Sequence, residues 1–177
     1  VNYEEKSAEK GHKTEEAINA IDDELTRYLI VLSGQQLNPK ESEVLTSILD
    51  SSRDLERIGD HSEALLNLTD YLHRKKVEFS PAALEELENI YHLTLDFIKE
   101  ALTSVETNNV DLANSLEAKH AEIDKLERSL RKTHIARLNK GECTPQAGVN
   151  FIDIISHYTR VADHAMNLAE KVQMEQI

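Results

Sequence analysis

The phrase RDLERIGDH, at positions 53–61, places two carboxylates on one face of a predicted helix. Glu56 and Asp60 are four residues apart, so their side chains are neighbours on the helix surface. Two like charges at this spacing destabilise an isolated helix by about 0.2–0.5 kcal/mol, and a bound divalent cation would reverse that effect. Because carboxylate oxygens are good ligands for hard divalent cations, the spacing favours a metal site.

The phrase YTRVADH, at positions 158–164, repeats this pattern about a hundred residues later. Asp163 corresponds to Asp60, and both phrases share R-x-x-D-H, whereas Thr159 stands where the first phrase has Glu56. An arginine three residues before an aspartate has salt-bridge spacing on a helix. A structural ion pair therefore explains the duplication as well as a metal does, and both interpretations stay open at this point.

The composition is that of an acidic, helix-rich protein. The 177 residues include 33 Asp and Glu against 20 Lys and Arg, which gives a formal net charge of −13. Such a surface repels nucleic acid and anionic lipid headgroups and attracts cations, so nucleic acid is not an expected partner. The one cysteine, Cys143, can form no intrachain disulfide, and no apolar run approaches the ~20 residues of a membrane span.

Prolines mark where the predicted helices begin. Each proline follows a residue that can cap a helix, in the pairs Asn38–Pro39, Ser80–Pro81 and Thr144–Pro145. Proline fits the first turn of a helix, and the preceding side chain can accept a hydrogen bond from a backbone N–H of that turn. We therefore expect helices to begin near positions 39, 81 and 145.

Between these marks the apolar residues recur with a helical period. The pattern predicts about five helices joined by short loops, which form an all-α, mostly antiparallel bundle. The stripes expected to face the core include Ile21, Ile48, Leu55 and Tyr91.

The chain also repeats itself within one predicted domain that covers residues 1–177. Asp60 and Asp163 are 103 positions apart, and other matched positions have similar offsets. We divide the domain into a first repeat at about 1–76 and a second at about 80–177. The second repeat has one more helix than the first, so the first repeat is predicted to lack its opening helix.

The segments DLERIGDH and RVADHAMNLAE resemble the signature of the PhoU family, whose members are built from two three-helix repeats. Four longer segments resemble the cytoplasmic C-terminal PhoU-like domain of bacterial sodium/phosphate cotransporters. They are DELTRYLIVLSGQQL, FSPAALEEL, HIARLNKGECTPQAGVNF and DIISHYTRVADHAMNLAEKV. The resemblance implies a domain that follows a membrane part, which would account for the missing helix and for a chain that opens on Val1.

The resemblance also implies metal ligands, because E/D-x-x-x-D pairs of the family hold multinuclear iron or other transition metals. Here some of these pairs lack one acidic residue. Thr159 stands in place of an acid before Asp163, and Asn19 stands in place of the aspartate that would follow Glu15 in the corresponding pair of the first repeat. We therefore expect at most one mononuclear site, for iron, manganese or zinc. The candidate metal ligands are Glu56, Asp60, His120, Asp124 and Asp163.

The function implied by the resemblance is that of a non-enzymatic regulatory domain on the cytoplasmic face of the plasma membrane. It would regulate a sodium-dependent phosphate transporter through contacts with the membrane-embedded part, in the same or another chain. The first alternative is a free-standing PhoU-type regulator of phosphate uptake. We expect a homodimer, because a missing helix leaves an apolar groove beside the first repeat. The sequence contains no glycine-rich loop, so direct phosphate binding is not expected.

A third hypothesis comes from a different class of protein. The motif E-x-x-H occurs at Glu9 with His12 and at Glu117 with His120, and diiron carboxylate oxidoreductases use two such motifs. The histidines of the repeated phrases, at positions 61 and 164, are predicted to be partly exposed helix residues.

Overall fold

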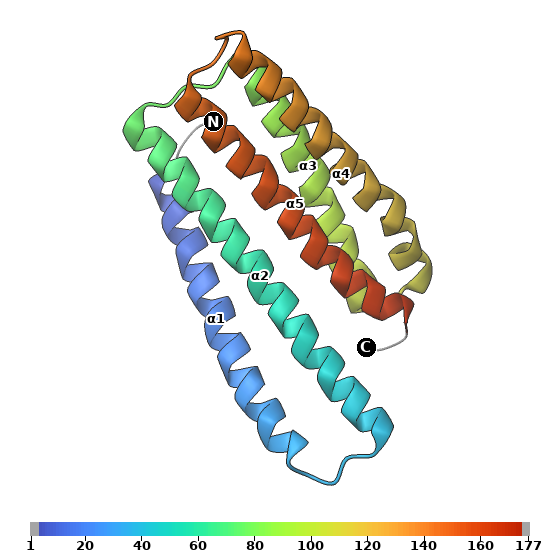
Figure 1. Cartoon of the computed structure of the whole chain (residues 1–177). Coiled ribbons are helices and arrows are strands. Elements are labelled where there is room, and N and C mark those ends of the chain that lie inside the picture. The colour runs from blue at the N-terminus through green and yellow to red at the C-terminus, as the bar shows by residue number, and fades with distance from the viewer. Residues whose placement is uncertain (1–3, 175–177) are drawn as a thin grey trace.

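The computed structural model describes residues 4–174, and within that range the chain forms five helices (Figure 1). They are α1 (Glu5–Ser33), α2 (Pro39–Lys75), α3 (Pro81–Thr107), α4 (Val110–Asn139) and α5 (Pro145–Gln173). The all-α fold predicted from the apolar period is confirmed, and three of the helices begin at the prolines.

Local hydrogen bonds explain these helix starts. The side chain of Asn38 accepts a hydrogen bond from the Glu41 backbone N–H at 3.0 Å, and the Glu41 carboxylate accepts one from the Asn38 N–H at 2.8 Å. This reciprocal capping box satisfies two N–H groups that would otherwise lack partners in the first turn. Ser80 and Thr144 cap α3 and α5 in the same way with one bond each.

The helices divide into a three-helix unit and a hairpin. Helices α3, α4 and α5 pack on one another, α2 packs on α5, and the backbone of α1 approaches that of α2 alone within residues 4–174 (Figure 1). The hydrophobic core lies in the three-helix unit, where Phe97, Leu116, Ile123, Phe151 and Ile155 are fully buried. Fully burying one such side chain contributes about 1.5–3 kcal/mol, so this unit supplies most of the hydrophobic stabilisation.

Four residues of the predicted stripes do not face the core. Ile21, Ile48, Leu55 and Tyr91 are 65%, 37%, 43% and 41% exposed. A helical stripe is buried only where another helix covers it. Ile21, Ile48 and Leu55 lie on the α1–α2 hairpin, which α5 covers along only one side, and Tyr91 of α3 faces an open groove. The prediction was therefore wrong for these positions, although their helical spacing was correct.

One buried histidine of the three-helix unit is expected to make the stability of the fold depend on pH. His134 of α4 is 2% exposed, and its ring stacks on Phe151 with centroids 4.3 Å apart. Burial lowers the pKa of His134 and the guanidinium of Arg137 lowers it further, while Glu86 opposes them. The thiol of Cys143, 3.8 Å from Nε2, is the other titratable group that faces the ring.

Acid should weaken the fold through this histidine. The pKa of His134 is lower in the folded chain than in the unfolded chain, so the unfolded state binds the proton more readily as pH falls below about 6.5. Binding of one such proton changes the free energy of unfolding by at most about 1.4 kcal/mol per pH unit. Urea unfolding between about pH 7.5 and about pH 5 should show a smaller pH dependence for His134→Phe than for the wild type.

The exposed His92 supplies the control for this measurement, because its side chain is 62% exposed. His92→Phe should retain the wild-type pH dependence. If both variants unfold with the same pH dependence as the wild type, His134 does not contribute.

Candidate functional site

Packing of α4 against α5 brings three of the five predicted metal ligands together. His120 and Asp124 lie one turn apart on α4, and Asp163 reaches them from α5. His120 Nε2 lies 3.0 Å from Asp163 Oδ1, and one ligand atom from each of the three residues lies within 4.8 Å of the others. The three residues therefore form the candidate metal site, which we call the His120 site.

The chemistry of the His120 site fits a transition metal. An imidazole nitrogen with carboxylate oxygens is a mixed ligand set that suits iron, manganese or zinc. The side chains of His120, Asp124 and Asp163 are 24%, 35% and 37% exposed, so water can complete the coordination. The nearest arginines are 3.8–3.9 Å from the two carboxylates, which leaves oxygen lone pairs for an ion.

The first repeat arranges its acidic pair differently. Arg57 donates to Asp60 at 3.1 Å and lies 3.5 Å from Glu56, so one guanidinium contacts both carboxylates. Burial raises the pKa of Glu56, and the charge of Asp60 raises it further. Within residues 4–174, neither carboxylate belongs to a group of three close metal-ligating side chains. An arginine–aspartate ion pair is thus present in both phrases, at 3.1 Å in the first and 3.9 Å in the second, and of the two aspartates Asp163 alone lies in a described group of three close ligating side chains.

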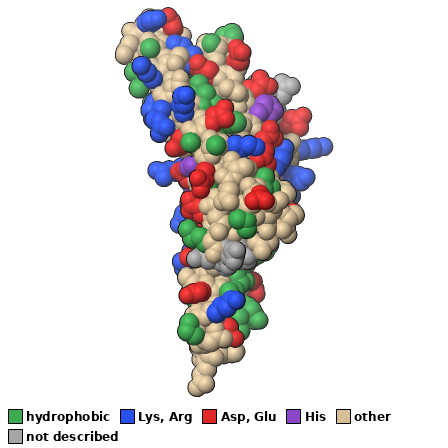
Figure 2. Space-filling view, turned by 90° about the vertical axis from the view of Figure 1, so that its right-hand side faces the viewer, with side chains coloured by type: hydrophobic (Ala, Val, Ile, Leu, Met, Phe, Trp, Pro, Cys, Tyr) green, Lys and Arg blue, Asp and Glu red, His purple; other side chains and the backbone are tan. Residues whose placement is uncertain are grey.

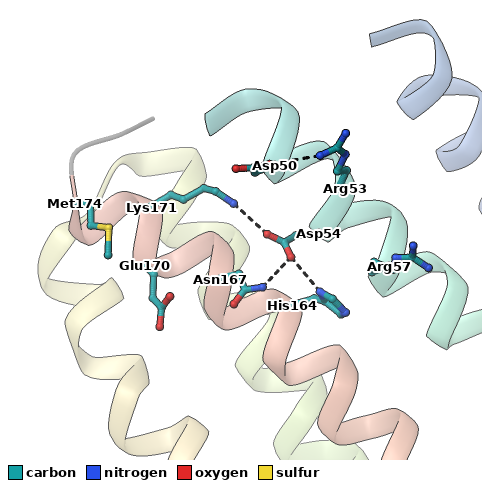
Figure 3. Close-up of a pocket in the computed structure, with 9 residues that line it drawn as sticks. All are labelled: Asp50, Arg53, Asp54, Arg57, His164, Asn167, Glu170, Lys171 and Met174. Carbon is teal, nitrogen blue, oxygen red and sulfur yellow. Dashed lines mark hydrogen bonds and ion pairs between the residues drawn. The ribbon is translucent and has the colours of Figure 1, made fainter. Parts of the chain in front are cut away.

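A buried carboxylate that the sequence did not single out joins α2 to α5. Asp54 accepts hydrogen bonds from His164 Nδ1 at 3.0 Å, Asn167 Nδ2 at 2.9 Å and Lys171 Nζ at 3.0 Å (Figure 3). Burial alone would raise the pKa of Asp54, but the hydrogen bonds from these three residues lower it below its usual value. Asp54 therefore remains charged and holds α2 against α5.

The same interface contains a row of histidines. His61 Nδ1 lies 3.1 Å from His157 Nδ1, and the His61 ring stacks on the ring of His164 with centroids 5.7 Å apart. Burial lowers the pKa of His61 and of His157, and the neighbouring rings lower that of His61 further. His61 and His164 are partly exposed helix residues, as predicted, and together with His157 they also connect the hairpin to the three-helix unit.

The α2–α5 contact, which is the backbone contact that attaches the hairpin to the rest of the described chain, therefore combines these polar groups with apolar side chains of α2 such as Ile58 and Leu65. A cavity of about 470 Å³ opens beside Asp54 and is lined by both acidic and basic side chains (Figure 3). The helical spacing of His164, Asn167 and Lys171 indicated that these three side chains share one face of a helix. It did not indicate their partner, because Asp54 lies more than a hundred residues earlier in the chain.

The structure separates the two E-x-x-H motifs. His12 Nδ1 of the first motif lies 2.9 Å from Glu63 Oε1 of α2, and the α1 backbone does not approach that of α4 within the described range. A diiron centre needs both motifs in one bundle core. The diiron hypothesis was therefore wrong for this fold.

A groove of about 620 Å³ is lined by residues of α1, α2, α3 and α5. Much of its lining is apolar and includes Ile18, Ile58, Leu66, Leu95 and Ile98.

Matched positions of the two repeats explain why the groove is open. Gly11 and Leu66 line it, whereas their counterparts in the second repeat, Leu116 and Ala169, are fully buried. A Cβ added at Gly11 would collide with the Leu66 side chain. The first repeat therefore has its small residue on α1 and its large one on α2, whereas the second repeat has the large residue on α4 and the small one on α5. Both counterparts belong to the buried cluster that includes Phe97 of α3, and the described residues before α1 contain no helix equivalent to α3.

In the part of the chain that the structure describes, no helix has the length and apolar character needed to cross a membrane.

These features define an acidic helical bundle with a candidate transition-metal site and an open groove. The sequence profile of the PhoU domain matches residues 1–69 and 87–172, so the chain belongs to the PhoU family. The chain is 32% identical over 155 residues to the phosphate-specific transport system accessory protein PhoU homolog 1 of Thermotoga maritima. The match covers 85% of this chain and 66% of that protein, so the chain spans about two thirds of its relative's length.

Solved structures agree with the fold. PhoU from Pseudomonas aeruginosa superposes with a TM-score of 0.84 at 23% identity, over 93% of this chain and 78% of that one. The phosphate transport system regulatory protein PhoU from Streptococcus pneumoniae superposes with a TM-score of 0.73 at 26% identity, over 93% and 76% of the two chains.

Proposed function

We propose that this protein is a PhoU-type accessory regulator of a phosphate transport system. It acts without catalysis, through contacts with the membrane-embedded transporter on the cytoplasmic face. The observation that carries this proposal is the 32% identity to a phosphate-transport accessory protein over 85% of the chain. The open groove supplies an apolar surface suited to a binding protein.

The relatives change the order of the sequence-based hypotheses. The sequence favoured the domain of a sodium/phosphate cotransporter, with the free-standing regulator as its alternative. The similar proteins carry the names of accessory and regulatory proteins of phosphate transport, which fits the alternative better.

The proposed function predicts a change in phosphate uptake. Deleting the gene in the organism that produces the protein should alter the rate of radiolabelled phosphate uptake several-fold in phosphate-rich medium, and wild-type protein should restore it. Uptake of an unrelated anion such as sulfate should be unaffected. Unchanged phosphate uptake would show that the protein does not regulate this transport.

The role of metal in this function is to fix the α4–α5 contact. His120 and Asp124 from α4, with Asp163 from α5, would hold one divalent transition metal between the two helices. An ion bound there would stabilise the second repeat, because its ligands come from different helices.

The groove predicts a homodimer. A second copy would cover the apolar lining, and burial of more than about 1,000 Å² is typical of a stable interface. Tyr91 lines the groove and is 41% exposed, so Tyr91→Glu should convert the dimer to a monomer in sedimentation velocity. Ile135 of α4, 49% exposed and outside the groove, provides the control Ile135→Glu. A wild-type protein that sediments as a monomer at high concentration would contradict this prediction.

A further inference from the structure

Each carboxylate of the His120 site has an arginine one helical turn away. Arg128 follows Asp124 by four positions on α4, and its Nη1 lies 3.8 Å from Asp124 Oδ2. On α5, Arg160 precedes Asp163 by three positions, and its Nη1 lies 3.9 Å from Asp163 Oδ2. Acidic and basic side chains also lie next to one another over the middle of the molecule in Figure 2. The site therefore has cations of its own chain beside it even without a bound ion.

The two arginines balance the charge of the site. Metal ligation requires a neutral imidazole on His120, so the ligands contribute a charge of −2 from their two carboxylates. Two guanidinium groups contribute +2, and the cluster is therefore neutral before any ion binds. A divalent ion would have to enter beside two groups of like charge, which oppose its binding.

Neither arginine is held firmly by its carboxylate. The separations of 3.8 and 3.9 Å are longer than a hydrogen bond, and the side chains of Arg128 and Arg160 are 69% and 68% exposed. Exposed ion pairs of this kind contribute little to stability. The guanidinium groups are therefore free to move into water when an ion takes the carboxylate oxygens.

The first repeat shows the alternative arrangement of the same phrase. Arg57, the counterpart of Arg160, donates a hydrogen bond to Asp60 at 3.1 Å. In the second repeat the aspartate contacts a ligand from another helix instead, since Asp163 lies 3.0 Å from His120 while Arg160 stays at 3.9 Å. The arginine of the phrase and the ligating partner thus compete for one carboxylate.

We propose that Arg128 and Arg160 set the metal affinity of the His120 site, because they neutralise its carboxylates and are displaced when an ion binds. Coulomb's law in water gives about a tenfold weakening of binding for one guanidinium group roughly 6 Å from a divalent ion. The metal-free site is neutral, so the α4–α5 contact does not require an ion, and the ion binds reversibly. This inference rests on the metal site included in the proposed function and identifies the residues that regulate it.

Removing one arginine charge tests the inference. Manganese should bind to Arg160→Gln about tenfold more tightly than to the wild type, and Arg128→Gln should have the same effect. The electron paramagnetic resonance signal of the free ion measures this binding. Binding that remains in Asp163→Asn is subtracted, because it lies outside the His120 site. Without metal, both arginine variants should melt near the wild-type temperature, since the exposed pairs contribute little.

Three controls separate the effect of charge from other effects of substitution. Arg53 of α2 is 63% exposed and pairs with Asp50 at 3.7 Å, again three positions apart, so Arg53→Gln should leave the manganese affinity unchanged. Arg160→Lys keeps the positive charge and should bind manganese within about twofold of the wild type. The tenfold gain of Arg160→Gln should also shrink between about 0.01 M and about 1 M salt, because salt screens charges in water.

The outcomes distinguish this inference from the metal site and from the proposed function. Equal manganese affinities of the wild type, Arg128→Gln and Arg160→Gln would overturn competition by the arginines, even if Asp163→Asn abolishes binding. If neither the wild type nor the arginine variants bind manganese through Asp163, the metal site and the inference both fail. Regulation of phosphate uptake would still stand, because gene deletion tests it separately. Binding by the arginine variants alone would support the inference, because the arginines then exclude the ion from the wild type.

Discussion

Replacing Asp54 with leucine should destabilise the fold by about 3–5 kcal/mol. The side chains of Asp54 and Lys171 are only 12% and 13% exposed, and removing the carboxylate leaves the ammonium group buried without its partner. His164 and Asn167 lose an acceptor at the same time. Urea unfolding followed by circular dichroism would measure the loss. The effect is large because the free energy needed to bury one unpaired charge exceeds the net contribution of the ion pair itself.

Two comparisons test this explanation. Asp50 lies one turn before Asp54, its side chain is 50% exposed and it pairs with Arg53 at 3.7 Å, so Asp50→Leu should cost only about 0–1 kcal/mol. Combining Asp54→Leu with Lys171→Met should recover much of the loss, because both buried charges are then absent. If Asp54→Leu costs no more than Asp50→Leu, the buried network does not hold the hairpin to the bundle.

Manganese, ferrous iron or zinc should raise the melting temperature of the wild-type protein. At a free concentration of about 100 times Kd, an ion that binds only the folded state adds about 2.7 kcal/mol, or roughly 5–10 °C for a domain of this size. Asp163→Asn should abolish the effect, since Asp163 is the ligand that joins α5 to the two ligands of α4. Thermal unfolding at several metal concentrations would measure it.

The first repeat supplies the control for the metal experiment. Asp60→Asn removes the aspartate that pairs with Arg57, and we expect the metal-dependent stabilisation to remain. Loss of stabilisation in Asp60→Asn, but not in Asp163→Asn, would place the ion in the first repeat. No stabilisation of the wild type would leave the contact between His120 and Asp163 as a hydrogen bond alone.

The sequence by itself determined the helices and most of the candidate ligands. Proline after a capping residue predicts a helix start because the required hydrogen bonds form within one turn, as Asn38 and Glu41 show. Glu56 and Asp60 could be placed on one helix face, and so could His120 and Asp124, because the helical period alone sets such spacings. The family resemblance then indicated that Asp163 accompanies the pair on α4.

Only the tertiary structure decided which of these residues meet. Asp54 and Lys171 are 117 positions apart, and no local pattern predicts that a carboxylate on α2 lies opposite a lysine on α5. The same packing gave Asp163 a histidine neighbour but left Asp60 with its arginine. It also left Val31 exposed in a stretch of the hairpin that no third helix covers. Helical periodicity determines which side chains share a face, whereas burial and pairing depend on the helix that packs against that face.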